Sequence, residues 1–214
     1  YVENLRTVMR VPAMLLLVGV MFLVSSAAVF VRPVVPLLVE GFTDADVETK
    51  SGFVFAAVAL TSAVAAVVSG RLAGRTGYRN ALVIATLGAG IAYVPVAVAN
   101  DLVPLLVLMA LVGVFSGAMI PMVNALIGAS APDGKHGSAF GLVGSAQALS
   151  FAVAPLLGGI TAKTLGIHAG FPIVGGMLIA VAALVWLTVR EPATLAAEEE
   201  PAAAPAPASS AASR

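Results

Sequence analysis

The 214-residue sequence contains no cysteine, few aromatic residues and few charged ones. Without cysteine the chain has no disulfide, no thiolate metal site and no thiol nucleophile. Lys plus Arg and Asp plus Glu are balanced at 11 each, with no long basic run, so the composition gives no indication of a nucleic-acid partner. Charged residues make up 10% of the chain and hydrophobic residues 60%, which excludes a water-soluble globular protein. We expect an integral membrane protein with no metal and no cofactor.

Six long apolar stretches follow one another along the sequence, and each is close to the about 20 residues that cross a bilayer as a helix. They span residues 11–39, 51–72, 81–99, 102–129, 138–162 and 171–189. The sequence therefore predicts an all-α integral membrane fold, with a bundle of six transmembrane helices over residues 11–190. Pro33, Pro36 and Pro121 are the expected breakpoints, because proline removes a helical donor and clashes with the preceding turn. Residues 1–10 are expected to form a cytoplasmic lead-in, and residues 191–214, rich in Ala, Pro and Glu, a disordered cytoplasmic tail.

The Lys and Arg residues predict the orientation of the bundle, because cytoplasmic loops of membrane proteins are enriched in both. One side of the bundle collects Arg6, Arg10, Arg71, Arg75, Arg79, Lys135, Arg190 and Arg214. The other side holds Lys50 and Lys163. We therefore expect a multi-pass protein of the cell membrane, with both ends of this segment in the cytoplasm.

An internal repeat of three helices is one interpretation of the sequence, and chance coincidence in a chain rich in Ala and Gly is the alternative. When the last three stretches are laid on the first three, Pro33 falls on Pro121 and Gly70 on Gly159. Three helices repeated with opposite topology are a design used by transporters.

Residues 70–80 follow the second stretch and combine glycines with arginines. Glycine permits a tight turn between closely packed helices, and arginine can bind carboxylates or helix C-termini. This segment resembles the signature cytoplasmic loop between the second and third helices of a six-helix half in the major facilitator superfamily. The matching residues are Gly70, Leu72, Ala73, Arg75, Gly77 and Arg79, whereas Gly74 stands where the family usually has an acid. The resemblance implies a loop that gates conformational change; the alternative is a loop that is positive only because it is cytoplasmic.

The fourth and fifth stretches carry a second set of motif residues. These are Gly113, Gly117, Pro121 and Asn124 in the fourth stretch, and Pro155, Gly158 and Gly159 in the fifth. They resemble helices ten and eleven of drug and metabolite efflux members of the same superfamily. The whole resemblance covers residues 6–190 and implies the C-terminal six-helix half of a twelve-helix fold with three-plus-three inverted repeats. It also implies helix kinks or an inter-bundle seam at Pro33, Pro121, Pro155, Gly158 and Gly159, with ordinary small-residue packing as the alternative for the 155–159 element.

Polar residues inside the apolar stretches are the candidates for substrate contact, because burying them in lipid is costly. Arg32 is expected at the outer mouth of a central cavity, where it attracts anionic groups or pairs with a carboxylate of the other half. The alternative is an arginine that reaches outward to the lipid headgroups. Asn124 and Gln147 are expected either to contact substrate or to bridge helices. No Asp or Glu lies within the six stretches, so a proton-coupling acid is expected in the other half.

The family resemblance implies a secondary active transporter that exports small lipophilic or amphipathic molecules by alternating access. Its partners would be a small-molecule substrate, the lipid bilayer and an N-terminal six-helix half that precedes Tyr1 in the native chain and supplies proton coupling. The alternatives are a non-transporting membrane scaffold or assembly partner, and a sugar or metabolite uptake member of the same superfamily. An intramembrane enzyme is not expected, because serine proteolysis needs a histidine base on a facing helix, and His136 and His168 both lie outside the stretches.

Overall fold

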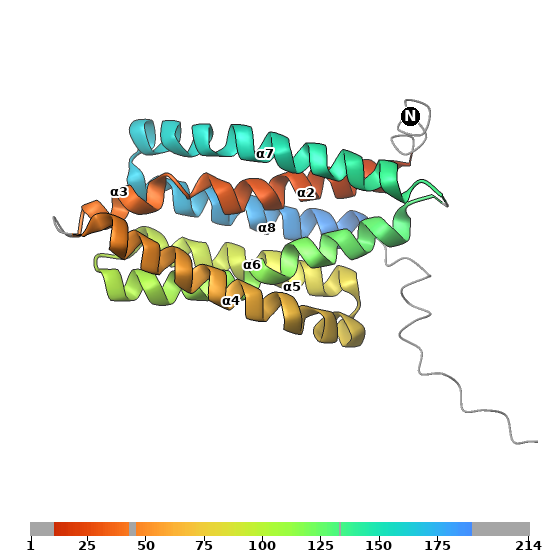
Figure 1. Ribbon diagram of the computed structural model, residues 1–214, viewed down its shortest axis with the longest axis horizontal. Helices are drawn as coiled ribbons and strands as arrows, with labels where there is room; N and C mark the ends of the chain where they lie inside the picture. The colour runs from red at the N-terminus through yellow and green to blue at the C-terminus, as the bar shows by residue number, and fades with distance from the viewer. Residues whose placement is uncertain (1–10, 43–45, 133, 190–214) are drawn as a thin grey trace, which may run out of the picture.

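The computed structural model describes residues 11–42, 46–132 and 134–189, and Figure 1 shows their arrangement. The expected lead-in and tail, and with them Arg6, Arg10, Arg190 and Arg214, lie outside the described residues. Within the described ranges every regular element is helical. Six spans are long and apolar enough to cross a membrane: Pro12–Glu40, Val47–Thr76, Tyr78–Val98, Leu102–Ser130, His136–Leu165 and Ile167–Thr188. The predicted fold class, an all-α bundle of six transmembrane helices, is confirmed.

The first span consists of two helices, α2 (Pro12–Phe30) and α3 (Val34–Glu40), separated by a break at residues 31–33. Pro33 lies in this break, where its missing N–H leaves one helical hydrogen bond unmade. The expected break at Pro33 is therefore present. Pro36 lies in the first turn of α3, where a backbone N–H has no acceptor within the helix and proline does no harm. The expected break at Pro36 is wrong for that reason.

The remaining spans are continuous. They are α4 (Val47–Thr76), α5 (Tyr78–Tyr93) with the 3-10 turn η1 (Val94–Val98), α6 (Leu102–Ser130), α7 (His136–Leu165), and α8 (Gly170–Thr188) preceded by the 3-10 turn η2 (Ile167–Ala169). Helix α6 passes through Pro121 without interruption, so the expected break there is also wrong. Met119, Met122 and Val123 on either side of the proline are buried.

The segment expected to be a loop, residues 70–80, is almost entirely helical. Helix α4 runs on to Thr76 and α5 begins at Tyr78, so that Gly77 alone connects them. Ala73 is fully buried, and alanine, leucine and arginine all favour helix, which carries α4 beyond the apolar stretch. Gly77 has φ +81°, a backbone conformation that a residue with a side chain rarely adopts. The expected glycine turn is present, but it is one residue long.

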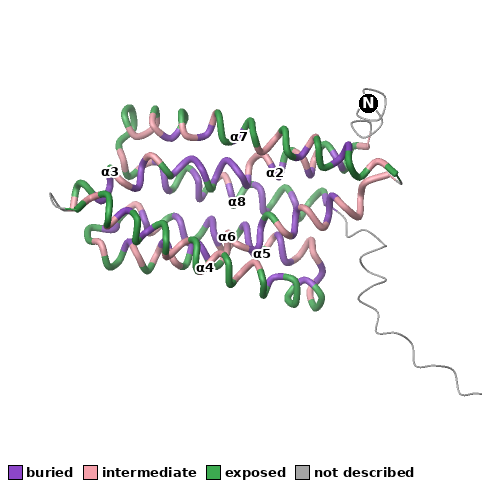
Figure 2. Tube along the Cα trace, in the orientation of Figure 1, coloured by how far each residue is buried: buried purple, intermediate pink, exposed green. Residues whose placement is uncertain are grey.

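The six spans pack as a bundle in which α4 and α7 lie at opposite margins. Helix α4 packs along α6, α5 packs against both α6 and α8, and α2 packs along α7. Figure 2 shows buried residues concentrated on α2, α5 and α8, whereas α4 and α7 are exposed along most of their length. The most buried helices are therefore α2, α5 and α8, and the outer helices α4 and α7 offer wide apolar faces.

Glycines allow the closest helix approaches. A side chain on Gly117 of α6 would meet the Ser62 carbonyl oxygen of α4 at 2.2 Å, and one on Gly113 would meet the Thr61 hydroxyl at 2.0 Å. Gly113 and Gly117 are four residues apart and so share one face of α6, the small-residue spacing that brings membrane helices together. On the other side of the bundle, a side chain on Gly158 of α7 would meet the Phe30 carbonyl oxygen of α2 at 2.1 Å.

Candidate functional site

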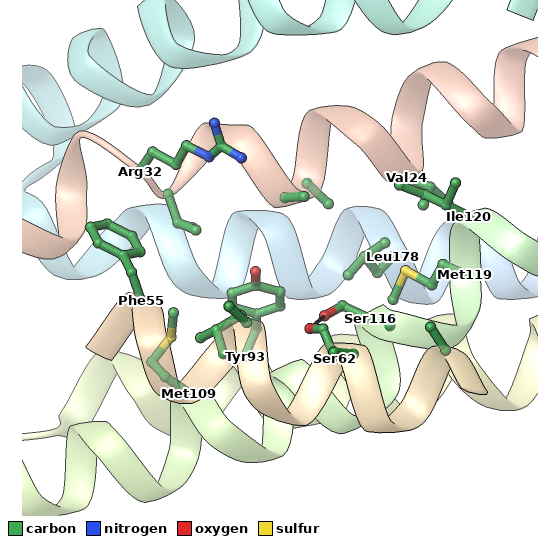
Figure 3. A pocket seen from close by; sticks show the side chains of 18 of the residues that line it. Val24, Arg32, Phe55, Ser62, Tyr93, Met109, Ser116, Met119, Ile120 and Leu178 are labelled. Carbon is green, nitrogen blue, oxygen red and sulfur yellow. Dashed lines mark hydrogen bonds between the residues drawn. The ribbon is translucent and has the colours of Figure 1, made fainter. Parts of the chain in front are cut away.

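A cavity of about 870 Å³ lies between α2, α4 and α6 (Figure 3). The side chains that line it are Val24, Ala27, Ala28, Val31, Arg32, Phe55, Val58, Ala59, Ser62, Ala63, Ala66, Tyr93, Met109, Ser116, Gly117, Met119, Ile120, Pro121 and Leu178. Its size falls within the range of sites that hold small molecules, and its lining is mostly aliphatic, as such sites usually are. The cavity is the best candidate for a ligand site in the described part of the chain.

Four polar side chains interrupt the apolar lining: Arg32, Ser62, Tyr93 and Ser116. Arg32 is the charged member, and no carboxylate is among the described residues that line the cavity. A site with this lining can hold an apolar body and offer it a few hydrogen bonds.

The two serines also join α4 to α6. The Ser62 hydroxyl donates a hydrogen bond to the Gly113 carbonyl oxygen at 3.1 Å, and the Ser116 hydroxyl bonds the same oxygen at 3.4 Å. The two hydroxyl oxygens are 3.4 Å apart, as the dashed line in Figure 3 shows. Because their protons are directed to protein acceptors, these serines hold the cavity wall and offer mainly lone pairs to a ligand.

Arg32 lies in the break between α2 and α3 and is exposed. Its guanidinium reaches along the cavity from the α2 wall (Figure 3). Without the break at Pro33 the backbone would continue as a regular helix here, so the proline helps to set the position of the arginine. The structure thus places Arg32 among the residues that line the cavity.

Tyr93, the last residue of α5, lines the cavity and, like Ser62 and Ser116, was not predicted from the sequence. Its side chain is 4% exposed, and its hydroxyl points across the cavity toward the α2 wall (Figure 3). A tyrosine within an apolar stretch was the available signal, because a buried phenol usually has a polar partner. Nothing in the sequence showed which face of the helix it occupies.

The other two predicted cavity residues, Asn124 and Gln147, do not line the cavity. The Gln147 amide nitrogen of α7 lies 3.5 Å from the Met21 sulfur of α2, and Ser150, one turn further on, donates to the Phe22 carbonyl oxygen at 2.8 Å. Both contacts join α7 to α2. Asn124 is half-buried on α6, one turn beyond Pro121.

The residues expected at kinks or at a seam lie in different settings. Pro121 lines the cavity, and Pro33 lies in the break beside Arg32. Gly158 is buried at the contact between α7 and α2, whereas a side chain on Gly159 would meet nothing within 4 Å. Pro155 is half-buried inside α7, which continues through it.

The residues of the expected gating loop separate into two groups. Arg79 is bound within the bundle: its guanidinium donates a hydrogen bond to the Trp186 carbonyl oxygen of α8 and lies over the Trp186 ring, 4.6 Å from the centroid. Gly70, Leu72 and Arg75, on the last turns of α4, are exposed. Gly77 is buried in the turn.

Comparison with known proteins identifies what this chain is similar to. Residues 8–213 match the model of the Major Facilitator Superfamily. The chain is 35% identical over 173 residues to Multidrug resistance protein MdtG of Yersinia enterocolitica, covering 79% of this chain and 42% of the relative. It is 34% identical over 172 residues to the Multi-drug resistance efflux pump PmrA homolog of Lactococcus lactis and over 173 residues to MdtG of Escherichia coli, with the same shares. The chain therefore spans less than half the length of these curated relatives.

Proposed function

This chain belongs to the major facilitator superfamily, and on that basis we propose that it forms the C-terminal half of an exporter of small lipophilic or amphipathic molecules. Membership of this family identifies a multi-pass membrane transporter rather than an enzyme and confirms the resemblance inferred from the motifs. Two multidrug resistance proteins among its relatives favour export of drug-like compounds over sugar uptake.

The observation that carries the proposal is the apolar cavity on α2, α4 and α6. In transporters built from two bundles, the substrate binds at the interface between them and the bundles rock about that site. One bundle supplies one wall of such a site. A six-helix N-terminal half in the same native chain would supply the other, in keeping with relatives of more than twice the matched length.

Proton coupling is proposed to reside in that other half. A proton-driven exporter needs a titratable group at the site, usually a carboxylate within the membrane. The described residues that line the cavity include no carboxylate. The C-terminal half would therefore bind substrate and move, while an acid on the facing bundle binds and releases the proton.

In the proposed orientation both ends of this segment lie in the cytoplasm. Lys50 and Lys163 lie on the outer side of the membrane. Figure 1 shows the α4–α5 and α6–α7 connections at one end of the bundle and the α5–α6 and α7–α8 connections at the other. The first end carries Arg71, Arg75 and Lys135. Positive residues favour the cytoplasm, so this end would be the inner one.

Gating is proposed to depend on Arg75 more than on Arg79. Arg75 is exposed at the inner end of α4, where it can reach carboxylates or helix C-termini of the facing bundle when the inner side closes. Arg79 already binds the end of α8 within its own half.

The test is export of a lipophilic dye from cells that make the full-length protein, with bulk introduced into the cavity. Ala63 lines the cavity, so Ala63→Trp should fill part of it and lower the export rate at least about tenfold, because a misplaced group at a binding site costs that much or more. Val64 is the neighbouring residue, 65% exposed and directed away from the cavity, so Val64→Trp is the matched control. Equal export by both variants would contradict the proposed site, and no export by wild type would favour the scaffold alternative.

A further inference from the structure

Two hydrogen-bond donors of the cavity wall, the Arg32 guanidinium and the Tyr93 hydroxyl, have no side-chain partner among the described residues. They differ in this from Ser62 and Ser116, whose hydroxyls donate to the Gly113 carbonyl. Tyr93 is more than nine-tenths buried, yet its hydroxyl faces the cavity (Figure 3). The Tyr93 hydroxyl is open to the cavity and the Arg32 guanidinium is exposed, so both can donate hydrogen bonds to a ligand there.

The two donors lie toward the same end of the cavity. Figure 3 shows Arg32 and Tyr93 in the part nearer α3, on opposite walls, with Met119 and Ile120 toward the other end. The far end is lined by aliphatic and thioether side chains. The charged group of the lining therefore lies toward one end of the cavity, where Phe55 and Met109 also lie, and the two serines lie between Tyr93 and Met119.

We propose that this half of the cavity selects amphipathic anions, molecules with one oxyanion group on an apolar body. The inference rests on the proposed function and adds the substrate class. The oxyanion binds the Arg32 guanidinium, which can donate two parallel hydrogen bonds, and accepts a third from the Tyr93 hydroxyl. The apolar body extends toward Met119 and Ile120.

The same lining disfavours lipophilic cations. Arg32 repels a second positive charge, and no described lining residue offers a carboxylate to offset that repulsion. Compared with an anion, an uncharged compound loses only the hydrogen bonds that an oxyanion accepts from Arg32 and Tyr93. The expected order of transport is anion, then neutral compound, then cation.

The experiment uses the full-length protein in vesicles and two fluorescent probes with one apolar body, dansylaminoundecanoic acid and its methyl ester. Arg32→Gln should lower transport of the acid about tenfold or more and leave the ester within about twofold, because a hydrogen bond to a charged group contributes more than one to a neutral group. Arg32→Lys keeps the charge and should recover part of the acid transport. Tyr93→Phe keeps the ring and should lower transport of the acid about threefold to tenfold.

The outcomes separate this inference from the proposed function. Selective loss of acid transport in Arg32→Gln, with partial recovery in Arg32→Lys, supports the inference that the site selects anions. Equal losses for acid and ester overturn it, since Arg32 then acts through the structure or through a carboxylate of the facing half. A wild-type protein that transports the ester and not the acid overturns this inference alone. Transport of neither probe, nor of any lipophilic dye, overturns the proposed function as well.

Discussion

The guanidinium of Arg79 at the start of α5 lies over the ring of Trp186 at the end of α8, with its Cζ atom 4.6 Å from the ring centroid. The same guanidinium donates a hydrogen bond to the Trp186 backbone carbonyl, one of the last carbonyls of α8 that have no partner within the helix. Helix C-termini favour a cation, so three effects act together at this contact. Arg79 therefore fastens the last helix of the bundle to the short turn at Gly77.

This contact predicts that the two arginines after Gly74 have different functions. Arg79→Ala should destabilise the full-length protein by about 1–2 kcal/mol, the sum expected for a cation–π contact and a charge-assisted hydrogen bond at a partly exposed site. Arg75→Ala should leave stability unchanged and slow transport. Thermal unfolding in detergent, together with dye export, measures both quantities. If Arg79→Ala leaves the unfolding temperature where it was, the contact contributes nothing to the bundle.

The close approach of α4 and α6 predicts that Gly117 tolerates no larger side chain. Gly117→Leu would force the leucine against the Ser62 backbone, and overpacking of this kind costs about 1–3 kcal/mol or more. Gly144 on α7 is exposed, and a side chain there would meet nothing within 4 Å, so Gly144→Leu is the control and should fold normally. The yield of monodisperse protein after detergent extraction compares them. Equal yields of the two variants would mean that α4 and α6 can move apart without loss of folded protein.

The proposed orientation predicts which positions a membrane-impermeant thiol reagent reaches in intact cells. In a background without other cysteines, Asn100→Cys and His168→Cys should be labelled from outside, since both residues are exposed on connections at the outer end. Gly74→Cys, exposed at the inner end of α4, should be labelled only after the cells are opened. Labelling of Gly74→Cys in intact cells would show that the orientation is the reverse of the one proposed, with the arginines at the end of α4 on the outside.

The fold could be predicted from the sequence because the bilayer restricts what an apolar stretch can do. About 20 predominantly apolar residues in a row form a spanning helix, so composition alone locates the spans. The ends were harder to predict. Helix α4 continues to Thr76 because charged residues in its last turns are exposed at the end of the bundle and still favour helix, whereas the sequence pattern indicated a loop there.

The site was predictable only in part, because a stretch that is apolar on every face does not reveal which face packs inward. Arg32 could be singled out since a charge within such a stretch is rare, and it does line the cavity. Asn124 and Gln147, expected either to contact substrate or to bridge helices, do not line the cavity, and Gln147 contacts Met21 of α2. Tyr93 needed the packing of α5 against α6 and α8 before its position could be known.

If the cavity between α2, α4 and α6 binds the transported molecule, that molecule should protect a cysteine in the cavity from chemical labelling. Ala63→Cys would place a thiol in the cavity and Val64→Cys one on the opposite face of α4, both in full-length protein without other cysteines. A transported dye should slow maleimide labelling of Ala63→Cys in proportion to its occupancy and leave labelling of Val64→Cys unchanged. Labelling of Ala63→Cys at the same rate with and without saturating dye would contradict the account.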